Sequence, residues 1–136
     1  MPTPISSDYA GFEYAMIRVV PRVEREEFVN AGLILFCLER QFLEARVTIE
    51  KARLKALWPG VDIDLVKQHL EAIPKICSGE LSAGPIGRLS LRERFHWLVA
   101  PRSTMIQMSP VHSGLCENPV QELDQLFKAT VLTPPL

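Results

Sequence analysis

The chain has 136 residues, of which 47% are hydrophobic and 23% charged. This is the composition and size of one folded domain and not of a disordered segment. Its 15 basic and 16 acidic residues leave a formal charge of -1, which excludes the basic excess typical of nucleic-acid-binding domains. The longest uncharged apolar run, residues 31–38, is too short to cross a bilayer. We therefore expect one domain over residues 1–136, with loose ends at residues 1–8 and 133–136, that binds neither membranes nor nucleic acid.

The three cysteines, Cys37, Cys77 and Cys116, are odd in number and form no Cys-x-x-Cys pair. This pattern matches neither a disulfide framework nor a zinc ribbon. The chain also does not open with the charged and then apolar segments of a secretory signal. We therefore interpret the cysteines as reduced thiols and expect a cytoplasmic location.

Three strands are predicted in the first part of the chain. Residues 12–20 are largely apolar on both faces, with Arg18 as an interruption, which indicates a strand covered on both sides. Residues 31–38 form a short apolar run, in which Gly32 is typical of a bulge or a close backbone approach. Residues 42–49 alternate between apolar and polar positions, which predicts one buried and one solvated face. These three strands are expected to form an antiparallel meander.

Two helices and a loop are predicted next. Residues 50–58 have helical spacing and stop at Pro59-Gly60. A second helix, capped by Asp62 or Asp64, carries an apolar stripe as far as Cys77 and should be kinked at Pro74. Residues 79–87 are rich in glycine and are expected to form a flexible surface loop.

The last part of the chain adds two helices and one strand. Ser90 and Glu93 have the spacing of a capping box, which predicts a helix over residues 90–99. Residues 102–109 are expected to form a fourth strand, followed by a turn at residues 110–114. Asn118-Pro119 is typical of a helix start, and the helix should run to Val131. The expected fold is therefore α+β: an antiparallel sheet of about four strands, the meander plus the later strand, with about four helices mainly on one side.

The connector at residues 21–30 is the first candidate for chemistry. Glu24, Glu26 and Glu27 lie beside Arg22 and Arg25, and paired carboxylates can bind metals or act in acid–base catalysis. A solvated, charged connector is the favoured interpretation, because neighbouring residues in an extended chain point to opposite faces.

Asn30 directly precedes the most apolar strand, so its amide must find partners or be costly to bury. A structural role is favoured, and a ligand contact remains the alternative.

The other motifs in the sequence do not identify a chemical reaction. His112 and Cys116 have a spacing that a metal or a thiol nucleophile could use on a helix, but they fall in the predicted turn. The chain has neither a phosphate-binding P-loop nor a nucleophile elbow. We therefore expect no metal and no cofactor. Trp97 lies off the apolar stripe of its helix near Arg94, which indicates either a contact surface or a cover for the sheet edge.

Two segments resemble signatures of a known family. They are residues 14–36, with Arg25-Glu26-Glu27-Phe28-Val29-Asn30-Ala31-Gly32 at their centre, and residues 95–103 together with 106–110. Both are similar to a bacterial family catalogued as domain of unknown function 3037, and the resemblance extends from Tyr14 to Val131. Its most specific element is Glu-x-x-Asn-x-Gly at Glu27, Asn30 and Gly32. The resemblance implies no activity; it implies a protein partner, a HipA-like kinase.

Two functional hypotheses follow. The first is a non-enzymatic accessory protein that presents a set of charged and aromatic residues to a protein partner: Arg18, Arg22, Glu26, Glu27, Asn30, Arg94, Trp97, Arg102, Ser103 and His112. The alternative is a phosphate- or carboxylate-binding module or small enzyme in which Arg18, Arg22 and Arg102 hold the anion and Glu27 or His112 acts as base. The alternative requires the segments around Asn30 and Arg102 to meet in space. Association of the chain with itself is left open.

Overall fold

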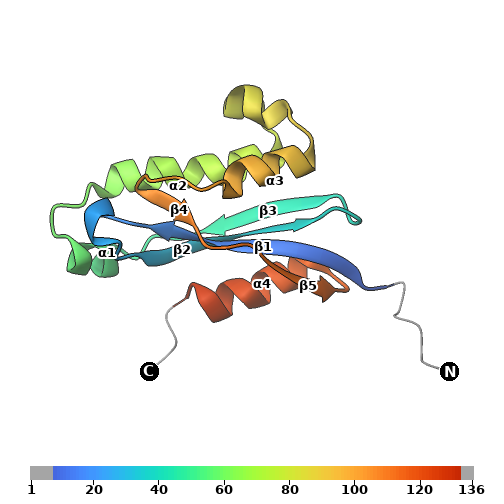
Figure 1. Ribbon diagram of the computed structural model, residues 1–136, viewed down its shortest axis with the longest axis horizontal. Helices are drawn as coiled ribbons and strands as arrows, with labels where there is room; N and C mark the ends of the chain where they lie inside the picture. Colours follow the sequence, from blue (N-terminus) through green and yellow to red (C-terminus); the bar gives the residue numbers. More distant parts are fainter. Residues whose placement is uncertain (1–7, 133–136) are drawn as a thin grey trace.

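The computed structural model describes residues 8–132, and the loose ends expected at 1–8 and 133–136 lie, except for Asp8, outside that range. The described chain forms one α+β domain around an open antiparallel sheet (Figure 1). The strand order is β3-β2-β1-β4, and β5 pairs with the other end of β1 on the same side as β4. The strands are β1 (Ala10–Val19), β2 (Val29–Cys37), β3 (Phe42–Val47), β4 (Ile106–Met108) and β5 (His112–Cys116).

The predicted meander is confirmed by the pairing of β1 with β2 and of β2 with β3. Both features expected of Gly32 are also present. The register passes from the pair Ile17 and Gly32 to the pair Arg18 and Asn30, which leaves Ala31 as the extra residue of a bulge. A Cβ atom on Gly32 would lie 2.5 Å from the carbonyl oxygen of Arg46. Only glycine therefore fits between these strands.

The helices are α1 (Lys51–Leu57), α2 (Ile63–Ser78), α3 (Leu91–Val99) and α4 (Pro119–Thr130). Their starts agree with the sequence signals. The Asp62 carboxylate accepts a hydrogen bond from the Leu65 amide, Ser90 and Glu93 form the expected capping box, and Asn118 caps α4. Helix α2 continues past Pro74 to Ser78.

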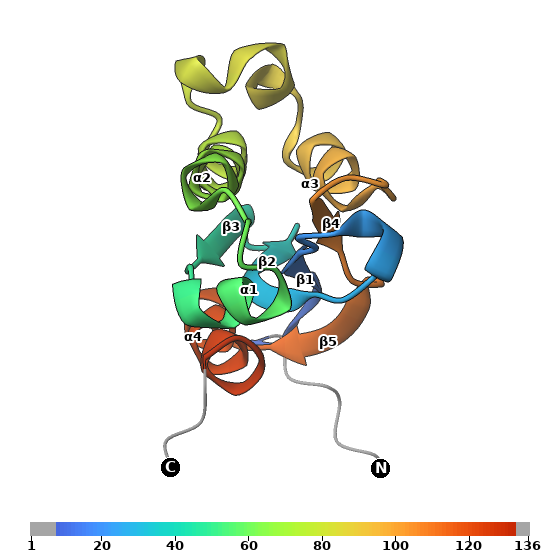
Figure 2. The same ribbon diagram turned by 90° about the vertical axis from the view of Figure 1, so that its left-hand side faces the viewer.

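The sheet separates two hydrophobic cores. Helices α2 and α3 cover one face, and α4 lies against the other (Figures 1 and 2). The first core includes Ile17, Val19 and Phe95, and α1 adds Leu54 to it; the second includes Leu33 and Leu123. Because β2 is buried on both faces, its sequence is continuously apolar and shows no alternation. The two faces are called the α2 side and the α4 side below.

Three local predictions require correction. The turn expected at residues 110–114 is wrong: β5 begins at His112 and pairs with the first half of β1. Gly114 permits this pairing because a Cβ there would lie 2.8 Å from the Phe12 ring. The loop expected at 79–87 contains a 3-10 helix, η2 (Leu81–Arg88), broken at Gly84. The fourth strand is shorter than expected, since residues 102–105 precede β4 without strand structure.

Candidate functional site

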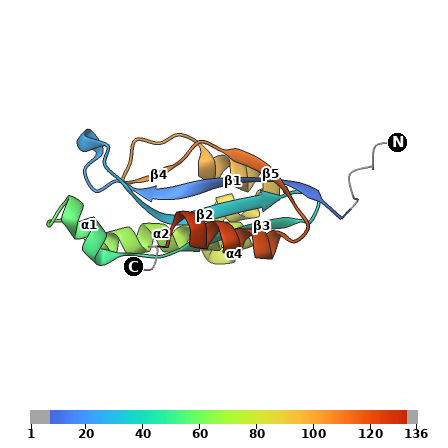
Figure 3. The same ribbon diagram turned by 90° about the horizontal axis from the view of Figure 1, so that it is seen from below.

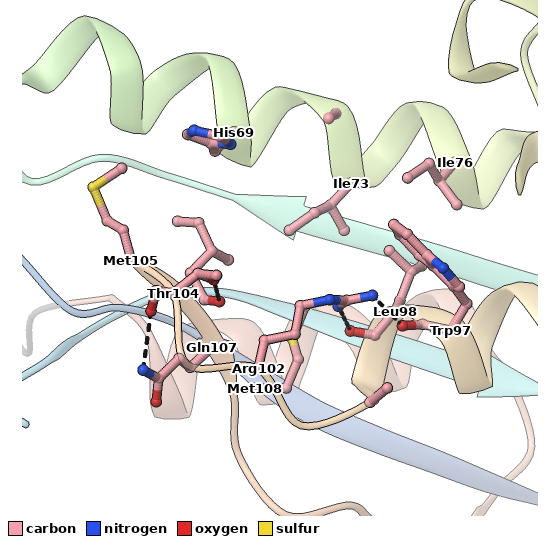
Figure 4. Close-up of a pocket in the computed structure, with 13 residues that line it drawn as sticks. His69, Ile73, Ile76, Trp97, Leu98, Arg102, Thr104, Met105, Gln107 and Met108 are labelled. Atoms are coloured by element: carbon pink, nitrogen blue, oxygen red, sulfur yellow. Dashed lines mark hydrogen bonds between the residues drawn. The ribbon is translucent and has the colours of Figure 1, made fainter. Parts of the chain in front are cut away.

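A groove opens on the α2 side between helices α2 and α3 and the segment 100–108 (Figure 4). Its volume is about 280 Å³. Helix α3 ends at Ala100 and Pro101, and the chain then runs to β4. Side chains only partly fill the space between this segment and α2, and the groove is what remains. The walls are mostly apolar, with polar groups near the opening. The residues of this α2-side groove are His69, Ala72, Ile73, Ile76, Trp97, Leu98, Ala100, Arg102, Thr104, Met105, Ile106, Gln107 and Met108.

Arg102 fixes one wall of the groove. Its Nη1 donates a hydrogen bond to the Leu98 carbonyl at 3.0 Å and its Nη2 donates to the Trp97 carbonyl at 2.6 Å (Figure 4). These carbonyls belong to the last turn of α3, which has no further helical donors. The Arg102 guanidinium carbon also lies 4.3 Å from the ring centroid of Trp97, the geometry of a cation–π contact. An indole that remains 40% exposed is therefore held in one place.

A second group of polar residues lies on the α4 side. Arg18 points away from its neighbours Ile17 and Val19, which pack in the core under α2. In the strand register Arg18 lies between Asn30 of β2 and Gln107 of β4. Its guanidinium carbon is 4.2 Å from the ring centroid of Phe28, a residue that is 44% exposed. We call Arg18, Phe28 and Asn30 the α4-side corner.

Helix α4 covers only part of this face. Figure 3 shows α4 lying along β2 and β3, while β1, β4 and β5 extend beyond it. The Asn30 side-chain amide donates a hydrogen bond at 3.1 Å to the Thr130 carbonyl, at the end of α4. Asn30 thus holds the end of this helix against the sheet, which is a structural role.

Two atoms of the corner have no hydrogen-bond partner in the described part of the chain. They are Nε of Arg18 and Oδ1 of Asn30, and both are buried. A buried donor or acceptor left unpaired costs about 1–3 kcal/mol. Within residues 8–132, one donor and one acceptor in neighbouring residues therefore keep unused hydrogen-bonding capacity.

The charged connector is solvated. Residues 23–25 form a 3-10 helix, η1 (Val23–Arg25). Arg22 pairs with Glu24 at 2.8 Å and Arg25 pairs with Glu27, and all four side chains are exposed. The Glu24 backbone amide and then the Arg22 guanidinium lower the pKa of the Glu24 carboxyl. The Glu24 and Glu27 carboxylates thus face neighbouring arginines, so they do not converge on a metal or substrate.

The remaining candidate residues lie elsewhere. Arg94 donates hydrogen bonds to the carbonyls of Leu89, Ile76 and Cys77, at 3.0, 3.0 and 2.7 Å, and so holds the end of α2. Glu26 and Ser103 are exposed, on the connector and just before β4.

His112 is exposed on β5, and its ring centroid lies 5.2 Å from that of Tyr14. Cys116 is four residues further along the same strand, which places the two side chains roughly 13 Å apart. They therefore do not form a ligand or nucleophile pair. Burial raises the pKa of the Cys116 thiol and raises that of Cys77 to about 12. Residues 8–132 contain no group of three or more His, Cys, Asp or Glu side chains suited to a metal.

The two sequence signatures meet where β1 pairs with β4, and the Ser109 hydroxyl there accepts a hydrogen bond from the Met16 amide at 2.8 Å. The Val20 amide donates a hydrogen bond to the Met105 carbonyl at 2.7 Å, so β1 and the segment before β4 are neighbours. The side chains separate: Arg18 and Asn30 lie on the α4 side, whereas Arg102 and Trp97 lie on the α2 side. Arg18, Arg22 and Arg102 therefore do not converge on one anion. Sequence reasoning missed His69 and Gln107, which have no local signal and join these sites only through long-range packing.

Fold and site together define a small single-domain α+β protein with an apolar groove on one side of its sheet and a polar corner on the other. A family profile described as "Protein of unknown function (DUF3037)" matches residues 14–131, and the chain belongs to this family. No curated protein and no solved structure is significantly similar to the chain. Within residues 8–132, every helix is too short or too polar to cross a membrane.

Proposed function

We propose that this protein is a non-enzymatic interaction module that receives an apolar side chain of a partner protein in the α2-side groove. The observation that carries the proposal is the pair formed by Trp97 and Arg102 at the edge of this apolar groove. Trp and Arg are the residues most enriched at the energetic centres of protein interfaces, next to well-packed pockets.

The pair is ordered before any partner arrives. Two hydrogen bonds and the stacking contact hold the Arg102 guanidinium, and Arg102 in turn holds the indole. Binding then requires little further ordering of these side chains, which removes part of the entropic cost of association. The apolar residues Ile73, Leu98 and Met108 form the wall against which a partner's side chain would pack.

The thiols support a binding role over a catalytic one. Burial raises the pKa of Cys77 and Cys116, so both stay protonated at neutral pH and are poor nucleophiles. All three cysteines are buried and unbridged, which fits a reducing cytoplasm. A HipA-like kinase in a bacterial cytoplasm is the partner that we would test first.

The experiment compares two tryptophans of nearly equal exposure, Trp97 at 40% and Trp58 at 39%. The protein would be purified with its partner from the native host, and binding of that partner would then be measured for Trp97→Ala and Trp58→Ala. We expect Trp97→Ala to weaken binding by tenfold or more and Trp58→Ala to leave it nearly unchanged, since interface centres cost about 2 kcal/mol or more when truncated. Equal effects of the two substitutions would contradict the proposal.

A second candidate function rests on the unpaired atoms of the α4-side corner. We propose that Arg18 binds the carboxylate or phosphate of a ligand, whose own N–H or O–H group donates to Asn30 Oδ1. Thermal unfolding with inorganic phosphate and with acidic peptides tests this: stabilisation should appear with the native chain and be absent in Arg18→Met. No stabilisation by either ligand would contradict it.

A further inference from the structure

The outer edge of the sheet at β3 has no neighbouring strand in the described part of the chain. Figure 2 shows β3 at the side of the sheet opposite β4, with α2 on one face and α4 on the other. The Thr48 amide donates to the Ala31 carbonyl, so even-numbered residues of this strand direct their main-chain groups toward β2. The main-chain groups of Leu43, Ala45 and Val47 therefore point outward. Such an edge is a template for another strand.

The side chains of this edge alternate in charge. Arg46 projects to the α4 side, where it pairs with Asp124 of α4 at 2.6 Å. Because side chains alternate along a strand, Glu44, two positions away, is directed to the same side. Glu44 is exposed and has no ion pair or side-chain hydrogen bond in the described chain. An acidic and a basic residue two positions apart can pair with each other's copies when the strand meets itself in antiparallel orientation.

We propose that two copies of the chain associate through β3, antiparallel and about a two-fold axis at Ala45, so that Glu44 of each copy lies opposite the partner's Arg46. Ala45 then faces the partner's Ala45, and Leu43 faces the partner's Val47. These residues point their main-chain groups outward, so about six hydrogen bonds continue the sheet across the axis. The pairs of Glu44 with the partner's Arg46 occupy the non-hydrogen-bonded positions, where side chains approach most closely.

Charge selects this register over its neighbours. In every possible register, residues whose main-chain groups point outward must face residues of the same kind in the partner strand. The alternative registers therefore place the two-fold axis one residue earlier or later, at Glu44 or at Arg46. A shift to Glu44 places Glu44 opposite its own copy, and a shift to Arg46 does the same for Arg46. Like charges directly opposite are destabilising. The axis at Ala45 is thus favoured by the charges, and it also gives the fullest overlap of the two strands.

The α2 side of the edge has room for the partner's apolar side chains. One hollow of about 380 Å³ lies between residues 43–45 of β3 and α2, where Pro74 and Cys77 form its apolar wall and Lys75, Ser78 and Glu80 its polar rim. A second, of about 220 Å³, is lined by Val47, Ile49 and Leu70. In the proposed pairing the partner's Val47 lies next to the first hollow and the partner's Leu43 next to the second. Apolar contacts on one face therefore accompany the ion pairs on the other.

Sedimentation velocity across a wide range of protein concentration tests the proposal. We expect a dimer for the native chain. Glu44→Lys places the new lysine of each copy opposite the partner's Arg46, which creates two repulsive pairs and should weaken the dimer by about tenfold or more. The matched control Glu26→Lys, on the exposed connector, should leave the dimer unchanged. Glu44 has no ion pair within the described protomer, so Glu44→Lys should retain the native melting temperature at a concentration where both proteins are monomeric.

Mixing two variants provides the decisive step. Arg46→Glu alone should also weaken the dimer, because it places two negative charges opposite each other. An equimolar mixture of Glu44→Lys and Arg46→Glu should restore a heterodimer, since each new charge then meets its opposite. If Arg46→Glu unfolds through the loss of its Asp124 partner, the Glu44→Lys result alone decides. A native chain that is monomeric at all concentrations, or a dimer that Glu44→Lys does not weaken, would overturn the proposal.

Discussion

The two sides of the sheet differ in how their polar groups are satisfied. In the α2-side groove, Arg102 donates two hydrogen bonds to carbonyl groups of α3 and stacks on Trp97. In the α4-side corner, Arg18 stacks on Phe28 in a similar way, but its Nε has no hydrogen-bond partner within residues 8–132. Two arginines that look alike in the sequence therefore have different roles. Arg102 builds a surface that is complete without a ligand, whereas Arg18 is left with unused hydrogen-bonding capacity.

The largest expected effect concerns Arg102. Arg102→Ala removes two hydrogen bonds from a charged donor and the contact with Trp97, and should lower the free energy of unfolding by about 2 kcal/mol. Trp97 should also become more mobile, which its fluorescence anisotropy would report. Chemical denaturation in urea measures the stability change. If Arg102→Ala were as stable as the native protein, the groove would not depend on this residue.

A smaller effect on the free energy of unfolding tests whether the core on the α2 side excludes water from Cys77. Burial raises the pKa of the Cys77 thiol from 9.0 to about 12, so above pH 9 the unfolded state loses this proton first. The stabilising contribution is therefore complete below pH 9 and is lost as pH rises toward the folded-state pKa, with a fall of roughly 1 kcal/mol between pH 9 and pH 10. Unfolding of the native chain and of Cys77→Ala at several pH values isolates this slope. Parallel curves would show that water reaches Cys77.

A still smaller effect is expected at Arg18. Arg18→Met removes the unpaired donor but keeps an unbranched side chain over Phe28, so the free energy of unfolding should stay within about 1 kcal/mol of native or rise. This outcome would contrast with Arg102→Ala, measured in the same urea titration. A loss as large as that of Arg102→Ala would mean that Arg18 has partners like those of Arg102, and the comparison of the two sides would fail.

The smallest effect is expected in the connector. Arg22→Ala breaks only an exposed ion pair with Glu24, and exposed pairs contribute little because water and salt screen them. We expect no measurable change in melting temperature at physiological salt. A clear drop would show that the connector is part of the folded core and not a solvated link.

Local signals predicted much of the fold. The strand β3 and the caps at Asp62, Ser90 and Asn118 depend on residues close in sequence, and all appear in the structure. The pairing of β5 with β1 was missed because it joins residues about a hundred positions apart. Nothing in the short segment 110–116 indicates that distant partner.

The candidate sites were only partly predictable for the same reason. Trp97 and Arg102 were each singled out, but their contact depends on how the chain turns after Pro101. Arg18 and Asn30 become neighbours through the bulge at Ala31. Packing against α2 or α4 decides which side of the sheet each residue faces. For this reason Arg18 and Arg102, which the sequence analysis placed in one group, lie on opposite sides.

The central claim is that a protein partner binds on the α2 side. Hydrogen–deuterium exchange of the protein, free and bound to the partner purified from its host, tests this directly. We predict slower exchange on binding in α3 and in residues 100–108, with exchange in β2 and α4 unchanged. Protection confined to the connector and the end of α4, with none in α3 or residues 100–108, would contradict the account.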